Sequence, residues 1–351
     1  MELSVHTSVP YNIIIERGCL NRLGELAAKR FQPGARTVVV GDSNVMPLYA
    51  KQVTRSLGAA GFAAGTFEFQ AGEENKRLST IEAMYRAFAD ARLTRSDFVV
   101  ALGGGVTGDM AGFAAATWLR GIRFIQIPTS LLAQIDSSIG GKTGVDIPQG
   151  KNLVGAFHQP SLVLIDPDTL KTLPPRFFAD GMGEAIKHGC IKNRALFDLI
   201  RDTDVRSDME HVIAENLKIK RAAVERDEFD NGERMLLNFG HTFGHALEKL
   251  HGYKGLSHGQ AVGIGMVMMT KCGEKAGLTE PGTSDEIAAV LRKYGLPTWD
   301  VADVADIVEI AMLDKKSRGG VLNLVMLKKI GESFLYHADK KRLLELTEAL
   351  R

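Results

Sequence analysis

The sequence has few cysteines and almost no net charge. Its 351 residues include three cysteines, an odd number, which are far apart and form no CxxC pair. A disulfide framework is therefore not expected, and a reducing compartment, the cytoplasm, is favoured. The formal net charge is +1. This argues against a nucleic-acid-binding protein, because such proteins normally have a basic excess. Any anion site must be a local cluster of lysines and arginines.

Long apolar runs are also missing. No segment approaches the roughly 18 apolar residues of a membrane-spanning helix, so no membrane association is expected. The first residues, MELSVH, lack the basic and apolar regions of a signal peptide. The hydrophobic content of 45% and charged content of 24% are typical of a globular protein. The length is sufficient for two domains.

Strand and helix patterns alternate in the first half of the chain. After two short strands at 3–6 and 11–16, further strands are expected at 37–40, 62–69, 98–102, 124–127 and 162–165. This alternation predicts an α/β domain with a mainly parallel, Rossmann-like sheet and helices on both faces.

Helical periodicity dominates the second half, which predicts a mainly α-helical domain. We place the boundary at Pro174-Pro175, which gives domains 1–174 and 175–351. One short strand is expected at 321–328. The expected helices are 178–200, 208–228, 236–251, 258–276, 284–294 and 303–312.

A glycine-rich turn follows the third strand of the alternating series. Gly103, Gly105 and Gly108 satisfy GxGxxG between a strand and a helix, where the backbone can approach a pyrophosphate at the helix N-terminus. The motif departs from the usual dinucleotide fingerprint, because it does not follow the first strand and no acidic residue ends the next one. Asp42, after an earlier strand, could bind a ribose hydroxyl or could simply cap the next helix.

Several polar residues lie on what the pattern predicts to be glycine-rich loops. The run DSSIGGKT resembles a P-loop but has Asp136 where that motif needs glycine. Lys142, Lys151 and Asn152 follow it, and Arg120 adds a cation after a helix. They are either solvated surface groups or ligands of an anion, since ligands of open α/β sheets bind at the carboxyl ends of strands.

Histidines are concentrated between positions 241 and 258, where four of the nine occur. His241 and His245 are four residues apart, so on a helix both imidazoles share one face. Asn238 is a possible N-cap of that helix. His258 precedes another apolar helix. Imidazole is a common ligand of zinc-like cations, although two such histidines can also be ordinary packed residues.

A carboxylate could complete this metal site. Glu184 lies among small residues, and Lys187 follows on the same helix face. The pair is either a surface ion pair or part of a site in which Glu184, His241 and His258 bind a metal. Three protein ligands with one open position are typical of a catalytic zinc. His245 would then act beside the metal as an acid or base.

Other polar residues of the second half suit a substrate with hydroxyl, carboxylate and phosphate groups. Lys220, Arg234 and Asn238 precede His241, and a helix presenting them toward one cleft could bind such a substrate. The other histidines are expected to be structural or at the surface: His6, His158, His188, His211, His251 and His337.

Six longer motifs occur in order within residues 36–331: GGGVTGDMAGFAAATWLRGI, QIPTSLLAQIDSSIGGKTGVD, GKNLVGAFHQP, GMGEAIKHG, NFGHTFGHALE and LSHGQAVGIGM. Together they resemble the 3-dehydroquinate synthase family of sugar phosphate cyclases, enzymes of the shikimate pathway to chorismate and the aromatic amino acids. The resemblance implies an N-terminal nucleotide-binding domain, a C-terminal helical domain and an active site in the cleft between them. It also implies a homodimer.

The resemblance implies a role for individual positions. NAD is implied to bind at Asp42, Glu73, Lys76, Gly104, Gly105, Val106, Asp109, Thr129, Ser130, Lys142, Lys151, Thr169, Leu170, Lys171 and Thr172. One divalent metal, zinc or cobalt, is implied to bind at Glu184, His241 and His258. Catalytic and substrate contacts are implied at Arg120, Asp136, Lys142, Asn152, Lys187, Lys220, Arg234, Asn238, His245 and one lysine of the pair Lys315-Lys316, of which we favour Lys316.

Two positions depart from the family pattern. Phe177 stands where a glutamate is usual before the metal-binding glutamate, and Ser130 replaces a threonine but keeps the hydroxyl. The implied substrate is 3-deoxy-D-arabino-heptulosonate 7-phosphate. Transient oxidation by NAD, phosphate elimination, reduction, ring opening and an intramolecular aldol step would convert it to 3-dehydroquinate and phosphate, so the enzyme is a lyase.

Three other functions are compatible with parts of the sequence. A metal-dependent NAD polyol or alcohol dehydrogenase would release reduced cofactor and would not need the phosphate-binding lysines. Another sugar phosphate cyclase would act on a different sugar phosphate. A nucleotide-binding module without enzyme activity explains the glycine turn but leaves the metal-ligand pattern unexplained.

Overall fold

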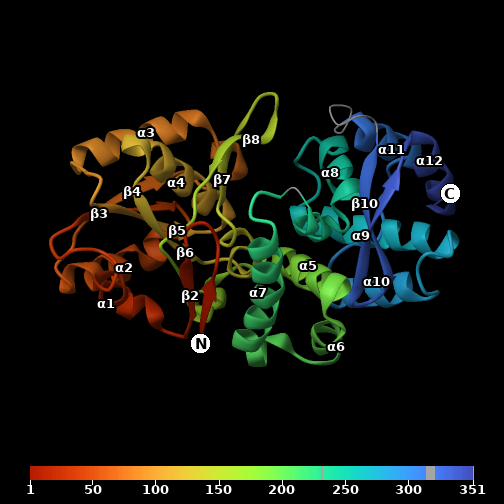
Figure 1. Cartoon of the computed structure of the whole chain (residues 1–351), viewed down its shortest axis with the longest axis horizontal. Coiled ribbons are helices and arrows are strands. Elements are labelled where there is room, and N and C mark those ends of the chain that lie inside the picture. Colours follow the sequence, from red (N-terminus) through yellow and green to blue (C-terminus); the bar gives the residue numbers. More distant parts are fainter. Residues whose placement is uncertain (231, 314–320, 351) are drawn as a thin grey trace. The chain divides into compact units, whose positions relative to one another are not determined.

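The structure, a computed structural model, describes residues 1–230, 232–313 and 321–350 (Figure 1). Its chain forms two compact units, Met1–Pro174 and Pro175–Arg351. The lysine pair Lys315-Lys316 lies outside the described residues. Among the helices that the structure describes, none is long and apolar enough to cross a membrane.

The first unit is built on a seven-stranded sheet with the order β1-β2-β9-β6-β5-β3-β4. Neighbouring strands are parallel except for the β1–β2 pair. The strands are β1 (Glu2–Val5), β2 (Tyr11–Ile15), β3 (Arg36–Asp42), β4 (Ala63–Phe69), β5 (Phe98–Gly103), β6 (Arg123–Pro128) and β9 (Leu162–Ile165), and a separate antiparallel hairpin comprises β7 (Lys142–Ile147) and β8 (Gly150–Phe157).

Both faces of this sheet are covered by helices, because its central strands are apolar on both sides. Val39 and Val100 pack against α1 and α2, whereas Val38 and Val99 pack against α3 and α4. In Figure 1 the two helix pairs lie on opposite sides of the strands. The predicted fold class is confirmed. The helices are α1 (Leu23–Ala28), α2 (Met46–Ala59), α3 (Leu78–Asp90) and α4 (Gly105–Thr117).

The β7–β8 hairpin, which packs on α4, differs from the prediction. Lys142, Lys151 and Asn152 were expected on loops, but they lie on its two strands. Glycine permits the close pairing of these strands: a Cβ on Gly155 would lie 2.1 Å from the carbonyl oxygen of Thr143. The same glycines led to the wrong prediction, since glycine clusters usually mark loops.

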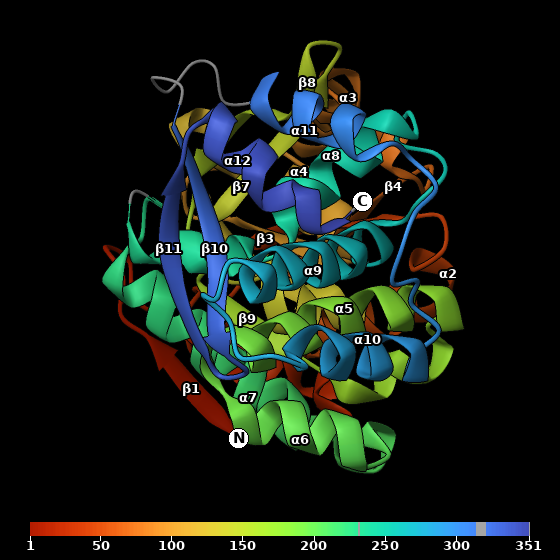
Figure 2. The same cartoon turned by 90° about the vertical axis from the view of Figure 1, so that its right-hand side faces the viewer.

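Helices dominate the second unit, as predicted. Its main elements are α5 (Pro175–Lys192), α6 (Arg194–Asp202), α7 (Met209–Arg226), the short 3₁₀ helix η7 (Glu233–Asn238), α8 (His241–Leu250), α9 (His258–Lys275), α10 (Thr283–Lys293), α11 (Val304–Leu313), α12 (Lys340–Thr347) and the antiparallel strands β10 (Leu322–Lys329) and β11 (Glu332–Ala338). Figure 2 shows the two strands side by side. The predicted strand corresponds to β10, whereas β11 and α12 were not predicted.

Two helix boundaries differ from the sequence prediction. The single helix expected over 178–200 is divided into α5 and α6 at Asn193, whose side chain accepts a hydrogen bond from the backbone of Leu196 and caps α6. The prediction that Asn238 caps the histidine helix is wrong. Asn238 ends η7, and α8 begins after Gly240, which has a φ of 80°. Glycine adopts this left-handed conformation without steric cost.

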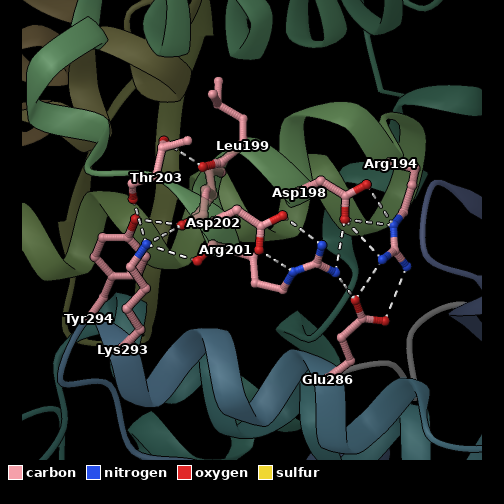
Figure 3. Close-up of polar contacts among 10 residues, drawn as sticks. Arg194, Asp198, Leu199, Arg201, Asp202, Thr203, Glu286, Lys293 and Tyr294 are labelled. Carbon is pink, nitrogen blue, oxygen red and sulfur yellow. Dashed lines mark hydrogen bonds and ion pairs between the residues drawn. The ribbon is translucent and has the colours of Figure 1, made fainter.

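A network of charges joins α6 to α10 (Figure 3). Glu286 on α10 contacts Arg194 at 2.7 Å and Arg201 at 2.5 Å. Lys293 donates hydrogen bonds to three carbonyl oxygens at the end of α6, including those of Arg201 and Thr203. A cation at a helix C-terminus satisfies carbonyl groups that have no partner within the helix. This network therefore fixes the end of α6 on α10.

Glycines allow α5, α8 and α9 to approach closely. A Cβ on Gly259 of α9 would lie 2.5 Å from the Cα of Asp180 on α5. A Cβ on Gly265, also on α9, would lie 2.0 Å from the carbonyl oxygen of Gly240 at the start of α8. A side chain larger than hydrogen at either position requires the backbone to move. The spacing of these three helices thus depends on glycine.

We predict that Gly265→Ala destabilises the second unit by about 1–3 kcal/mol, the usual cost of overpacking. Gly263→Ala on the same helix is the matched control, because its Cβ would approach the flexible Leu291 side chain at 3.2 Å. Urea unfolding followed by circular dichroism measures both. Equal stability of the two variants would contradict the close approach of α8 and α9.

Candidate functional site

The glycine turn of the first unit leads from β5 into α4. Gly104 is the N-cap of α4, and Gly105 is its first residue. A Cβ on Gly104 would lie 3.4 Å from the hydroxyl oxygen of Ser130, so the turn lies beside the loop that follows β6. This loop contains Thr129. The first N–H groups of a helix have no partner within the helix and favour a negative group.

The turn adjoins the point where the strand order reverses. From β3 the chain passes through α2 to the edge strand β4, and then returns through α3 to β5 on the other side of β3. Ligands of such sheets bind at this switch point, beyond the carboxyl ends of the strands. Asp42 ends β3 there. Its carboxylate accepts hydrogen bonds from the backbone of Asn44 and Val45, so it caps the turn before α2, and its ribose contact stays a prediction.

A buried lysine links three elements near this edge. Lys76 Nζ donates to Asp109 Oδ2 on α4 at 2.7 Å and to Asn152 Oδ1 on β8 at 2.6 Å. The Lys76 side chain is 5% exposed. Burial raises the pKa of nearby Glu73, and the charges of Lys76 and Lys151 oppose that rise. Several residues that were expected to contact NAD therefore form one charged cluster with Asn152 of the expected substrate set. They are Glu73, Lys76, Asp109 and Lys151.

The segment after β9 lies at the same carboxyl edge, and its hydroxyl groups bond within the unit. Thr169 Oγ1 accepts a hydrogen bond from the buried amide of Gln134 at 2.9 Å. Thr172 Oγ1 and the hydroxyl of Tyr49 on α2 are 2.5 Å apart. Sequence reasoning did not single out Gln134 or Tyr49, since neither belongs to a recognisable motif.

Arg120 is separated from these residues. It follows α4, whereas the glycine turn precedes that helix. A helix of 13 residues is about 20 Å long at ~1.5 Å per residue. Within the first unit, Arg120 is therefore near the amino ends of the strands. Asp136 lies on the short helical segment Ala133–Ser137 that follows β6.

In the second unit three helices bring the candidate metal ligands together. Glu184 is on α5, and His241 and His258 are the first residues of α8 and α9. Glu184 Oε1 lies 3.7 Å from His241 Nε2 and 3.4 Å from His258 Nε2. One potential ligand atom from each of the three residues lies within 4.8 Å of the others. This donor set matches the three-ligand pattern of catalytic zinc.

Charge at this cluster favours an ionised carboxylate. Glu184 and Lys187 are each 1% exposed, and Lys187 Nζ donates to Glu184 Oε2. The alternative of a surface ion pair is therefore wrong. Burial alone raises the pKa of Glu184, but Lys187 and the histidines outweigh it and hold the pKa well below its ordinary value. Among the described residues Glu184 Oε1 has no hydrogen-bond donor. A buried anionic oxygen facing two imidazole nitrogens fits a divalent cation.

Further contacts orient the two imidazoles. His241 Nδ1 lies 3.1 Å from the carbonyl oxygen of Phe239, and His258 Nδ1 lies 3.5 Å from Glu248 Oε1. Burial and Lys187 lower the pKa of His241 well below its ordinary value. Burial also lowers the pKa of His258, but Glu184 and Glu248 outweigh it and raise the pKa to about 10.

The other predicted residues of this unit are spread over η7, α7 and α8. Arg234 is buried, and its guanidinium donates to the carbonyl oxygen of Glu228 at 2.6 Å. Lys220 is buried on α7, whereas Asn238 and His245 are exposed. The ring centroids of His245 and His241 are 5.3 Å apart. The single helix expected to present Arg234, Asn238 and His241 is not formed, because Gly240 separates η7 from α8.

Phe177, which stands where the family usually has a glutamate, alters the protein surface and does not alter the metal cluster. Phe177 is on the first turn of α5 and is 38% exposed. The guanidinium of Arg176 lies over its ring at 4.6 Å from the centroid. The aromatic ring thus covers part of a neighbouring cation, and the change from glutamate leaves Glu184 in place two turns further along the helix.

We predict that Lys76→Met destabilises the first unit by about 2–3 kcal/mol, because it leaves the mostly buried carboxylate of Asp109 without its cation. The matched control is Lys171→Met. Lys171 pairs with Asp168 at 2.9 Å but is 71% exposed, so its loss should cost about 0–1 kcal/mol. Urea unfolding of both variants provides the comparison. Equal losses would show that the buried position of Lys76 has no energetic consequence.

Comparison with known proteins gives consistent results over most of the chain. Residues 66–180 match the profile described as 3-dehydroquinate synthase N-terminal, and residues 181–317 match the profile described as 3-dehydroquinate synthase C-terminal. The 3-dehydroquinate synthase of Clostridium acetobutylicum is 47% identical over 337 residues, which cover 94% of each chain.

Solved structures share the complete fold. A 2-epi-5-epi-valiolone synthase from Streptomyces hygroscopicus subsp. jinggangensis, with NAD+ and Zn2+ bound, is 27% identical and superposes with a TM-score of 0.86 over 99% of both chains. A 2-deoxy-scyllo-inosose synthase complexed with carbaglucose-6-phosphate, NAD+ and Co2+ is 24% identical, with a TM-score of 0.85 over 99% of both chains. At that identity the second comparison supports the fold alone.

Proposed function

The chain belongs to the 3-dehydroquinate synthase family, and we propose that it converts 3-deoxy-D-arabino-heptulosonate 7-phosphate to 3-dehydroquinate and phosphate. The family and the class of enzyme were predicted from the linked motifs, and both predictions are confirmed. The main structural support is the convergence of Glu184, His241 and His258 around a buried carboxylate oxygen that has no hydrogen-bond donor in the described part of the chain.

Two cofactors complete the proposed chemistry. When bound, NAD+ takes up and returns a hydride, and a zinc or cobalt ion acts as a Lewis acid on the hydroxyl that is oxidised. We propose that Glu184, His241 and His258 hold the ion. The donor chemistry supports this assignment, since one carboxylate and two imidazoles suit zinc and related ions.

For NAD we propose the carboxyl edge of the first unit. The glycine turn at Gly104-Gly105 would receive the pyrophosphate at the first N–H groups of α4. Asp42, Glu73 and the Lys76–Asp109 pair would bind polar groups of the nucleotide. Further proposed contacts are Val106, Thr129, Ser130, Lys142, Lys151, Thr169, Leu170, Lys171 and Thr172.

The side chains of the second unit would bind and orient the sugar phosphate. Lys187 donates a hydrogen bond to Glu184 and lowers the pKa of that carboxyl. We therefore propose that stabilising the ionised carboxylate is part of the function of Lys187, in addition to attracting the phosphate. His245 is accessible beside His241 and could transfer a proton or bind the phosphate. Arg234 and Lys220 would bind the carboxylate and hydroxyl groups.

The further proposed substrate contacts are Asn238 in the second unit and Arg120, Asp136, Lys142 and Asn152 in the first. The proposed contact at Lys316 falls outside the described residues. The proposed contacts include the cationic side chains that a substrate with one phosphate and one carboxylate needs for binding.

We predict that the metal-loaded protein releases one phosphate per 3-dehydroquinate formed without net accumulation of reduced NAD. Phosphate release and nicotinamide absorbance, recorded together, test this. Stoichiometric reduced NAD would instead identify a dehydrogenase. Phosphate release from a different sugar phosphate, with none from the proposed substrate, would identify another cyclase.

In the same assay His241→Ala should abolish turnover and weaken metal binding by more than about 100-fold, since loss of a direct ligand should exceed the ~10–100-fold effect of an outer contact. The matched control is His211→Ala, which changes an exposed histidine of α7. Metal content after dialysis gives a second measurement. Retained metal and turnover in His241→Ala would exclude His241 as a ligand.

We also propose that the chain functions as a homodimer in the cytoplasm. Its three cysteines are free and buried, which suits a reducing compartment. Arg120 follows the opposite end of α4 from the glycine turn, so a second copy of the chain could supply this implied substrate contact.

A mixing experiment tests the proposed homodimer. We predict that inactive Arg120→Ala and inactive His241→Ala regain activity when they are refolded together, because one site of the mixed dimer then has both residues. Each variant refolded alone is the control, and light scattering gives the mass. A monomer, or dimers without complementation, would contradict this assignment.

A further inference from the structure

One acidic side chain beside the metal cluster has no role in the function proposed above. Glu248 lies on α8, seven residues after His241, so both side chains lie on one side of the helix. Its side chain is 6% exposed, and Oε1 lies 3.5 Å from Nδ1 of His258. His258 therefore lies between two buried carboxylates, with Nε2 facing Glu184 and Nδ1 facing Glu248.

We propose that Glu248 is a positioning residue for the metal site, which accepts a hydrogen bond from Nδ1–H of His258 and so directs the lone pair of Nε2 toward the metal. The inference rests on the proposed function only in that the ion at Nε2 is the one used in the reaction. Glu248 does not belong to the residues that were implied to bind the metal, the cofactor or the substrate.

The chemistry of imidazole explains why this contact matters. A neutral imidazole has one N–H, and the hydrogen bond made by that group determines which nitrogen is free to bind a metal. A carboxylate acceptor fixes the ring orientation and also increases the basicity of the other nitrogen. Burial of Glu248 strengthens the effect, because a buried carboxylate is costly without a donor.

The second histidine is oriented in a comparable way. His241 Nδ1 faces the carbonyl oxygen of Phe239 at 3.1 Å. Both orienting oxygens thus belong to α8 or to the residue just before its N-cap. Since α8 packs closely on α9, one rigid helix would set the orientation of His241 and of His258.

A competing role for Glu248 is direct binding of a second cation. Potential ligand atoms of His245, Glu248 and His258 also lie within 4.8 Å of one another. Because Nδ1 of His258 faces Glu248, an ion bound between these two groups would displace the proton of Nδ1. The two roles are therefore exclusive at Nδ1, and the buried position of Glu248 opposite that nitrogen favours the hydrogen bond.

The test compares Glu248→Leu and Glu248→Gln with the wild-type chain. We expect Glu248→Leu to weaken Co2+ binding by about 10–100-fold, as measured by competition with a chromophoric chelator. Glu248→Gln keeps an acceptor oxygen and should lose less affinity. In the zinc-loaded wild type, ¹⁵N NMR of the histidines should show His258 with the proton on Nδ1, and Glu248→Gln should preserve this tautomer.

The matched control is Glu309→Leu, which removes an exposed carboxylate of α11, and its Co2+ affinity should equal that of the wild type. Unchanged affinity in folded Glu248→Leu, or a His258 proton on Nε2, would overturn the proposal. Two bound ions in the wild type and one equally tight ion in Glu248→Leu would instead identify a second cation site.

These measurements use metal affinity, stoichiometry and the histidine tautomer, and they need no sugar phosphate. Failure of the wild type to release phosphate would contradict the proposed function and would leave the expected effect of Glu248 intact. Conversely, normal turnover with unaltered metal affinity in both Glu248 variants would overturn the role of Glu248 alone.

Discussion

The buried carboxylate of Glu184 is the constraint on which the second unit depends. Removing a carboxylate from water costs several kcal/mol unless other charges compensate. Here an ammonium group contacts one oxygen, and two imidazoles face the other. The same arrangement that lowers the pKa of the carboxyl also leaves one oxygen available to a cation. Stability and metal chemistry thus require the same three helices in the same place.

Each proposed ligand is next to a glycine at a helix contact. Glu184 follows Gly183, His241 follows Gly240, and His258 precedes Gly259. A Cβ on Gly183 would lie 3.0 Å from the carbonyl oxygen of Gly259. Because the helices approach without intervening side chains, short side chains on different helices can reach one ion. The glycines therefore determine the ligand geometry without contacting the ion.

Much of the fold could be predicted because its strands have a strong local signal. The β-branched run at 37–40 and the apolar run at 98–102 became β3 and β5, both buried on two faces. The hairpin of β7 and β8 was missed because glycines allow strand pairing there while resembling loop residues. Its Gly144 would place a Cβ 2.6 Å from the carbonyl oxygen of Val154 on the opposite strand, a contact that local patterns cannot indicate.

The site was less accessible to sequence reasoning than the fold. Histidine spacing indicated His241, and the sequence suggested Glu184 and His258 as its partners. It left a surface ion pair open as the alternative, because the proximity of the three residues arises from helix packing. Glu248 was missed, since a single glutamate on an amphipathic helix usually faces water. Its burial depends on where α9 places His258. A glutamate two helical turns after a metal-binding histidine is the only signal that could have suggested it.

X-ray absorption spectroscopy of the zinc-loaded chain is the most direct test of metal binding by Glu184, His241 and His258. We predict two imidazole nitrogens at about 2.0–2.1 Å and one carboxylate oxygen at about 2.0–2.2 Å, with the carboxylate contribution lost in Glu184→Ala. A shell made only of water oxygens, or one unchanged by that substitution, would contradict it.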